Sequence, residues 1–134
     1  MSTPTRLLIV DDEPEILLLY KVKFERSGFN VLTATNGQEA IDVATKEKPD
    51  LIVMDVKMPL IDGITAQKLI HEKPETKDLK FVFLTAFSDP AAHDIDTNFG
   101  HESGVLGVIR KGDDLNTLVE AVRGFAAAAQ QHTS

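Results

Sequence analysis

The chain has 134 residues and a hydrophobic fraction of 43%, with no cysteine, 21 acidic and 14 basic residues, and a formal net charge of −7. This length predicts one domain, and the acidic balance argues against nucleic-acid binding by this chain, because nucleic acid is itself densely negative. Without cysteine there can be no disulfide, thiolate metal site or cysteine nucleophile. No apolar run approaches the ~20 residues that span a bilayer, so we expect a soluble, cytoplasmic protein without membrane contact.

Short apolar runs alternate with longer segments of helical period along the first half of the chain. We expect strands at residues 7–10, 31–34 and 51–54, and helices at residues 14–27 and from Asn36 to just before Pro49. Pro14 suits the first turn of a helix, where its missing N–H has no partner. Gly28 is a favourable residue to end that helix.

The second half continues the alternation. We expect a helix from Asp62-Gly63 to about residue 70, strands at 81–84 and 105–109, and a last helix capped by Asp113 or Asp114. The domain is expected to span residues 1–126, with residues 127–134 as a frayed tail. The interval between Thr85 and Lys111 has a poor helical pattern, which predicts either a short, displaced or mobile helix or a harmless surface insertion.

Strands that are apolar throughout are covered by helices on both faces, which indicates parallel pairing. Five such β–α units predict a doubly wound α/β sandwich of three layers, and we expect the flavodoxin-like strand order 2-1-3-4-5. In such sheets the ligand site lies beyond the carboxyl ends of the strands. The residues at those ends are Asp11, Asp12, Asp55, Thr85 and Lys111.

The first and third strands are neighbours in this order, so their three aspartates should converge. Clustered carboxylates repel one another, and a divalent cation such as Mg²⁺, which takes oxygen ligands, would hold them ionised. Lys111 and the hydroxyl of Thr85 add the cation and donor that phosphoryl transfer requires. Asp55 would then be the nucleophile and form an aspartyl phosphate.

These residues resemble the receiver domain of bacterial two-component response regulators, from Leu7 to about Ala126. The matching motifs are Asp11-Asp12-Glu13-Pro14, the run DVKMPLIDG from Asp55 to Gly63, Thr85-Ala86, and Lys111. Each motif alone is common, but their order at successive strand ends is specific. The resemblance implies a single-domain, CheY-like phosphoacceptor rather than an enzyme, which receives phosphate from a histidine kinase or phosphotransfer protein and switches a protein-interaction surface.

The resemblance also assigns the ligands of the cation. It implies that Asp12, Asp55 and the backbone carbonyl of Lys57 bind Mg²⁺ directly, whereas Asp11 acts mainly through water.

On the phosphoryl side of the site, the resemblance implies that Lys111 pairs with the phosphoryl group and that Thr85 moves towards it. Ala86 is small enough to leave the acyl phosphate accessible. Lys57 and Phe87 each follow a motif residue by two positions and would border the phosphoryl group. A cation and a bulky ring there are expected to slow its hydrolysis.

Two positions depart from the family pattern. Val108 stands where most receivers have an aromatic residue whose rotamer reports phosphorylation, and valine is stiff at χ1. That coupling is therefore expected to be absent or rerouted, with Phe87 and Phe99 as candidates. Gly112 stands where many receivers have proline, which predicts a freer loop after Lys111.

The first helix has apolar residues on more than one face. Ile16, Leu17, Tyr20 and Phe24 share one face at about 100° per residue, while Leu18 and Val22 point away from it. We interpret Leu18 and Val22 as a docking surface for the kinase. Partial cover by the stem of Lys21 is the alternative.

Other functions remain open at this stage. The chain would also suit a phosphorelay intermediate or a receiver fragment of a longer regulator. An aspartyl-phosphate phosphohydrolase is weaker, because such enzymes usually have an acid two residues after the nucleophile, where this chain has Lys57. A nucleotide-binding flavodoxin-like module would lack its Gly-rich loop. The histidines (His71, His93, His101 and His132) are expected to be solvated surface residues.

Overall fold

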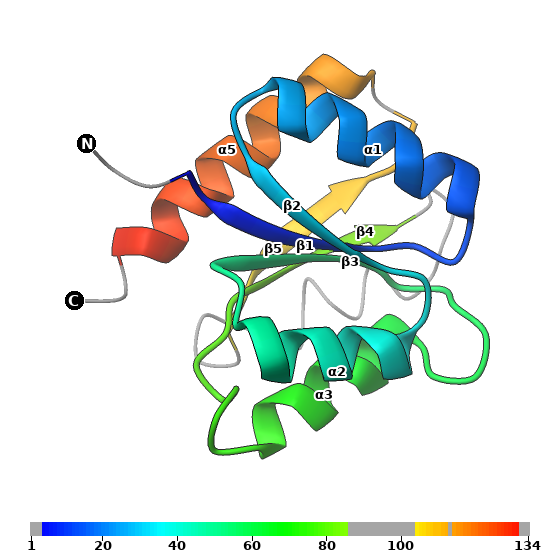
Figure 1. Cartoon of the computed structure of the whole chain (residues 1–134), viewed down its shortest axis with the longest axis vertical. Helices are drawn as coiled ribbons and strands as arrows, with labels where there is room; N and C mark the ends of the chain where they lie inside the picture. The colour runs from blue at the N-terminus through cyan, green and yellow to red at the C-terminus, as the bar shows by residue number, and fades with distance from the viewer. Residues whose placement is uncertain (1–3, 86–103, 113, 132–134) are drawn as a thin grey trace.

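One parallel sheet lies between two layers of helices in the computed structural model, which describes residues 4–85, 104–112 and 114–131 (Figure 1). The elements are β1 (Arg6–Val10), α1 (Pro14–Arg26), β2 (Asn30–Ala34), α2 (Gly37–Glu47), β3 (Leu51–Asp55), α3 (Gly63–Glu72), β4 (Phe81–Thr85), β5 (Val105–Arg110) and α5 (Leu115–Gln131). Within these ranges, no helix is both long enough and apolar enough to cross a membrane.

The sheet has the order β2-β1-β3-β4-β5, and every adjacent pair is parallel, so the predicted fold is confirmed. The register between β1 and β3 pairs Val10 with Met54. The residues that follow, Asp11 and Asp55, therefore come level with each other at the carboxyl edge of the sheet. Strand pairing alone thus places the two carboxylates in one site.

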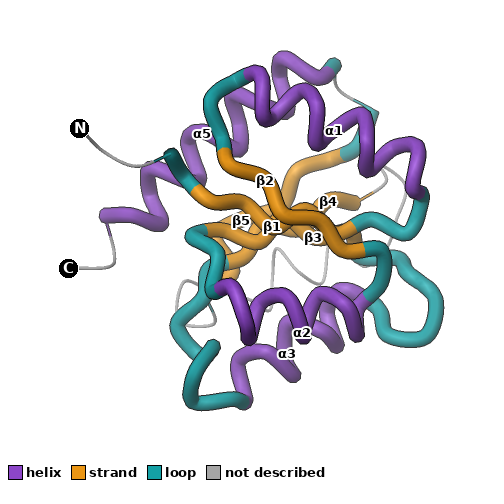
Figure 2. Tube along the Cα trace, viewed as in Figure 1, coloured by secondary structure: helices purple, strands orange, loops and turns teal. Residues whose placement is uncertain are grey.

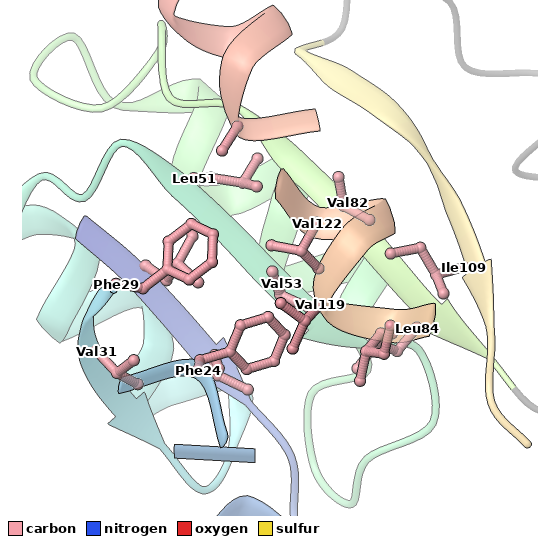
Figure 3. Packing of buried hydrophobic residues seen from close by; sticks show 14 of the residues in the cluster. Phe24, Phe29, Val31, Leu51, Val53, Val82, Leu84, Ile109, Val119 and Val122 are labelled. Atoms are coloured by element: carbon pink, nitrogen blue, oxygen red, sulfur yellow. The ribbon is translucent and has the colours of Figure 1, made fainter. Parts of the chain in front are cut away.

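Helices α1 and α5 cover one face of the sheet, and α2 and α3 cover the other (Figures 1 and 2). Leu7 and Ile9 of β1 belong to the core cluster beneath α1 and α5, whereas Leu8 and Val10 belong to the opposite cluster. Because successive side chains of a strand point to opposite faces, a sheet covered twice needs strands that are apolar throughout. Figure 3 shows the first cluster, in which Phe24 of α1 lies near Val119 of α5.

Three helices begin with the capping residues that the sequence predicts. The carboxylate or amide oxygens of Asn36, Asp62 and Asp114 accept hydrogen bonds from the backbone N–H three residues later, at 2.8, 2.7 and 2.8 Å. Each bond satisfies a donor that has no partner within the first turn of its helix. The other candidate for the last cap, Asp113, lies outside the described residues.

The last helix is longer than predicted. We expected a frayed tail from Ala127, but α5 continues to Gln131. Alanine has the highest helix propensity, and Ala129 is buried, so the final turns pack on the domain. The helix expected between Thr85 and Lys111 falls at residues 86–103, outside the part of the chain that the structure describes.

Strand β5 contains an irregularity where it pairs with β4. Phe81 pairs with Val105, but Val82 pairs with Gly107, so Leu106 is an extra residue in β5. Gly107 lies under the ring of Phe125, where an added Cβ would be 2.6 Å from two ring atoms. After the irregularity, Val108 packs against the core cluster on the α2 and α3 side.

Candidate functional site

Three carboxylates converge at the carboxyl edge of the sheet. One oxygen from each of Asp11, Asp12 and Asp55 can be chosen so that all three atoms lie within 4.8 Å of one another. Asp11 is fully buried and Asp55 is 5% exposed, while Asp12 is open to solvent. The convergence predicted from the strand order is therefore present, with one ligand group facing outward.

Lys111 supplies the positive charge of the site. Its Nζ lies 3.2 Å from Oδ2 of Asp11 and 3.0 Å from Oδ2 of Asp55. The backbone N–H of Lys111 donates to the carbonyl of Thr85 at 2.7 Å, which fixes the end of β5 against the end of β4. One ammonium group thus bridges two carboxylates that come from β1 and β3, and negative charge remains in excess.

The backbone at the start of α1 also holds Asp11. Its second oxygen, Oδ1, accepts a hydrogen bond of 2.9 Å from the backbone N–H of Glu13, the N-cap residue of the helix. The side chain of Glu13 makes no capping hydrogen bond. The partial positive charge of a helix N-terminus favours a carboxylate at this position. Asp11 is therefore held through both oxygens, by Lys111 and by the helix.

Gly63 brings the start of α3 against the end of β3. Its N–H donates to the carbonyl of Val56 at 2.8 Å. An added Cβ would lie 2.2 Å from the carbonyl oxygen of Asp55, which no side chain tolerates. The Asp62-Gly63 pair thus has two roles, because Asp62 caps the helix and Gly63 allows its close approach to Asp55.

An open hollow of about 320 Å³ lies beside the carboxylates and is lined by Asp12, Lys57, Met58, Pro59 and Asp62. The side chain of Lys57 is exposed, so it is available to a molecule that enters from solvent. Of these residues, the sequence indicated Met58 and Pro59 only as parts of the motif, and Asp62 also as the start of a helix. The hollow makes them part of the approach to Asp55.

The charges of the site shift the pKa values of its central pair. Burial raises the pKa of Asp55 above that of an ordinary aspartate, and the hydrogen bond and charge of Lys111 oppose that effect only in part. Burial alone would lower the pKa of Lys111, but Asp55 and Asp11 together raise it. The two rises have different causes: burial is the main one for Asp55, whereas Lys111 gains two carboxylate partners.

The donor set fits Mg²⁺, because it consists of carboxylate oxygens with one outward-facing member and contains no sulfur or imidazole. Lys111 compensates only part of the negative charge of the three carboxylates, and the remaining charge favours binding of a cation. When bound, the ion would neutralise charge on phosphate oxygens. Asp11, Asp12 and Asp55 are the residues whose carboxylate oxygens lie close enough together to hold it.

Thr85 is buried at the end of β4, one strand from Asp55. The neighbouring candidates Ala86 and Phe87 lie outside the described residues, as does Phe99. Tyr20 was predicted only to face the core from the first helix. In the structure, Tyr20 also lines a small cavity together with Lys111. The regular spacing of apolar residues indicated a buried face and gave no sign of this second neighbour.

The prediction that His71 is a solvated surface residue is wrong. Its Nε2 lies 2.9 Å from the carbonyl of Leu79, so Nε2 carries the proton, and its Nδ1 accepts from the amide of Gln67. Its ring also packs edge-on against Phe81, with centroids 5.0 Å apart. His71 therefore ties α3 to the segment before β4. The other three histidines lie beyond the described ranges.

The raised pKa of Asp55 leads to a prediction about stability. Because the folded state holds this proton more tightly than the unfolded chain, the free energy of unfolding falls as pH rises between the two pKa values. We expect Asp55→Asn to be more stable than the wild type at neutral pH in buffer with a chelator. The difference should vanish in acid, where Asp55 is protonated in both states, and should shrink when Mg²⁺ is added. Urea unfolding across pH measures it, and a variant less stable than the wild type at neutral pH would contradict it.

Comparisons with known proteins agree with this geometry. Residues 7–123 match the family model of the response regulator receiver domain. The chain is 31% identical over 121 residues to the sporulation initiation phosphotransferase F of Bacillus subtilis, and the match covers 90% of this chain and 92% of that protein. It is similar to the crystal structure of the chemotaxis response regulator CheY4 of Vibrio cholerae, at 27% identity and a TM-score of 0.78, over 91% of this chain and 98% of that one.

Some relatives are considerably longer than the match. The chain is 47% identical over 68 residues to the alkaline phosphatase synthesis transcriptional regulatory protein PhoP of Bacillus subtilis, which is 51% of this chain but only 28% of that protein. The chain thus spans less than a third of the length of this regulator. The match to the family model covers most of the chain. The chain therefore belongs to the response regulator receiver domains, the CheY-like domains of two-component signalling.

Proposed function

We propose that this receiver accepts a phosphoryl group on Asp55 and thereby changes the affinity of a protein-interaction surface. The observation that carries the proposal is the buried carboxylate of Asp55, 3.0 Å from Lys111 Nζ and beside two further aspartates. Receiver domains are phosphorylated by histidine kinases or phosphotransfer proteins, so a phosphohistidine is the proposed donor. Such domains are generally phosphoacceptors rather than enzymes.

In the proposed step, an oxygen of the Asp55 carboxylate attacks the phosphorus of the phosphohistidine. The new O–P bond forms as the N–P bond breaks, and the histidine nitrogen keeps the electron pair and takes a proton from solvent. Lys111 is placed to neutralise charge on the transferred group. Since its ammonium already lies between Asp11 and Asp55, it needs only a small shift to do so.

The remaining site residues have proposed roles that follow from their positions. Asp12, Asp55 and the backbone carbonyl of Lys57 would hold Mg²⁺, and Asp11, which is held through both oxygens, would act through a water molecule. Thr85 would donate its hydroxyl to a phosphoryl oxygen. For Ala86 and Phe87, the proposal depends on the sequence motif alone.

A role as a phosphorelay intermediate is the second candidate. It is favoured by the similarity to the sporulation initiation phosphotransferase F, whose length the match covers almost completely. A receiver within a longer regulator is equally compatible with the partial match to PhoP. An aspartyl-phosphate phosphohydrolase has less support, because Lys57 occupies the position where such enzymes usually have their second acid.

Exposed apolar residues on α1 provide a docking surface for the phosphodonor protein in this proposal. Leu18 is 61% exposed and Val22 is 40% exposed, whereas Leu17 and Phe24 are buried. The alternative, cover by the stem of Lys21, has less support because Leu18 stays largely exposed beside it. Helix α1 begins two residues after Asp12, so a protein bound there is close to the site.

The direct test is intact mass after incubation with acetyl phosphate. We expect a gain of one phosphoryl group that requires Mg²⁺ and is lost in Asp55→Asn. The Asp62→Asn variant is a matched control, because it removes a carboxylate from the hollow while an amide oxygen can still cap α3. A gain that persists in Asp55→Asn would place the acceptor elsewhere.

The lifetime of the phosphorylated protein tests the proposed effect of Lys57 and Phe87. Because a cation and a ring beside the phosphoryl group hinder attack by water, Lys57→Ala and Phe87→Ala should each shorten the half-life measured by intact mass. Lys68→Ala, which removes an exposed lysine on α3, should leave it unchanged. Equal half-lives in all four proteins would remove both residues from this role.

Docking on α1 predicts a difference between protein and small-molecule donors. Leu18→Asp should slow transfer from the histidine kinase that phosphorylates the wild type fastest, because a charge would enter an apolar contact. Phosphorylation by acetyl phosphate should not change, since no docking is involved. Leu69→Asp on α3, where the native side chain is 37% exposed, is the control. Unaltered kinase transfer in Leu18→Asp would rule out this docking surface.

A further inference from the structure

Tyr20 and Lys111 share a small cavity between α1, the ends of β4 and β5, and the start of α5. Its volume is about 40 Å³, roughly the space that one water molecule occupies in the liquid. The other lining residues are Leu84, Arg110, Gly112, Leu115 and Leu118. Tyr20 also packs against the core cluster of this face. Its half-buried side chain thus lies between the core and the lysine of the site.

The backbone after Lys111 gives the lysine little support. Gly112 has a φ of +112°, and no atom lies within 4 Å of the position that its Cβ would occupy. Glycine is the residue that adopts this conformation most readily, and it restricts the chain least. The position of the Lys111 side chain is therefore determined by its two carboxylate partners and by the walls of the cavity, where Tyr20 is the aromatic side chain among the described residues.

The phenol of Tyr20 is within electrostatic range of the whole site. Burial raises its pKa, the charge of Lys111 opposes this rise, and Asp11, Asp55 and Glu13 add to it. The hydroxyl is therefore neutral at physiological pH, and its surroundings depend on the charges at Asp55 and Lys111. A phosphoryl group on Asp55 would change both.

The opposite face of the sheet offers no comparable group among the described residues of β5. Val108, the position where most receivers have an aromatic side chain, is a stiff β-branched residue packed against the α2 and α3 cluster. On the face that α1 and α5 cover, Gly107 has no side chain and lies under Phe125. On the described part of the chain, Tyr20 is the aromatic residue that lines a cavity with the site lysine.

We propose that Tyr20 is a positioning residue, which holds Lys111 over Asp55 and transmits the phosphorylation state of Asp55 to the surface between α1 and α5. This inference depends on the proposed function. When the phosphoryl group draws the ammonium of Lys111 away from Asp11, the lysine stem shifts along the ring of Tyr20. The ring then moves relative to Leu115 and Leu118 at the start of α5, and the α1–α5 surface changes with it.

The chain contains one tyrosine and no tryptophan, so its tyrosine emission reports Tyr20 alone. We expect the emission of the wild type to change when acetyl phosphate and Mg²⁺ are added, in step with the gain of a phosphoryl group measured by mass. Asp55→Asn, which keeps Tyr20 but removes the proposed phosphoacceptor, should show no change in emission when acetyl phosphate and Mg²⁺ are added.

Substitutions separate positioning from packing. Tyr20→Ala should slow phosphorylation by acetyl phosphate roughly 10- to 100-fold, because a misplaced charge is costly in a positioned site. Tyr20→Phe keeps the ring and should restore most of the rate. Phe125→Ala is the matched control: it also removes a half-buried ring from the same cluster, but one that does not line the Lys111 cavity, and it should leave the rate unchanged.

The outcomes are distinct. A phosphoryl group gained without any change in Tyr20 emission would overturn the transmission to the surface. Equal slowing in Tyr20→Ala and Phe125→Ala would mean that both variants act through loss of packing, and would overturn the positioning role. If no phosphoryl group were gained by the wild type, the proposed function would fail and this inference with it.

Discussion

The bridge from Lys111 to Asp11 and Asp55 is the interaction on which the site depends. Two carboxylates that are almost fully buried share a single ammonium, which is itself only a quarter exposed. One positive charge cannot compensate two buried negative ones, and Asp12 adds a third nearby. The site is therefore stable enough to form but retains an excess of negative charge. That excess of negative charge favours binding of a divalent cation. A phosphoryl group, which is itself negative, would need such a cation beside it.

The fold makes this arrangement possible because it brings the carboxyl ends of the parallel strands together at one edge of the sheet. The register of β1 and β3 sets Asp11 beside Asp55, and the pairing of β4 and β5 sets Lys111 beside Thr85. Two core clusters, one on each face, hold the strands in that register, and Figure 3 shows the one beneath α1 and α5. A shift of one residue would move each strand side chain into the opposite core cluster, where it does not fit, so the packing of the core fixes the geometry of the site.

The parts of the structure that the sequence predicted are those with local chemical causes. Asn36 and Asp62 are caps whose bonds stay within three residues, and the uniformly apolar strands require helices on both faces. The proximity of Asp11, Asp55 and Lys111 is not local, but it was predictable because the strand order places the three residues at the same edge of the sheet. In contrast, the environment of His71 depends on Gln67, Leu79 and Phe81, which have no common period in the sequence. The prediction of a frayed tail was wrong as far as Gln131, where α5 ends. Tertiary packing buries Ala129, and composition does not reveal that packing.

The contrast between local motifs and tertiary packing also applies to the site itself. The motif residues determine what the site can bind. How a change at the site would affect the surface depends on the side chains that lie beside Lys111. The irregular pairing at Leu106 turns Gly107 towards Phe125 and leaves Val108 against the opposite cluster, so β5 has no ring beside the site. On the other side of Lys111, Tyr20 and Leu115 line a cavity that leaves room for movement. The proposed path from Asp55 to the surface therefore runs through α1 and α5, because Tyr20 lines this cavity together with Lys111.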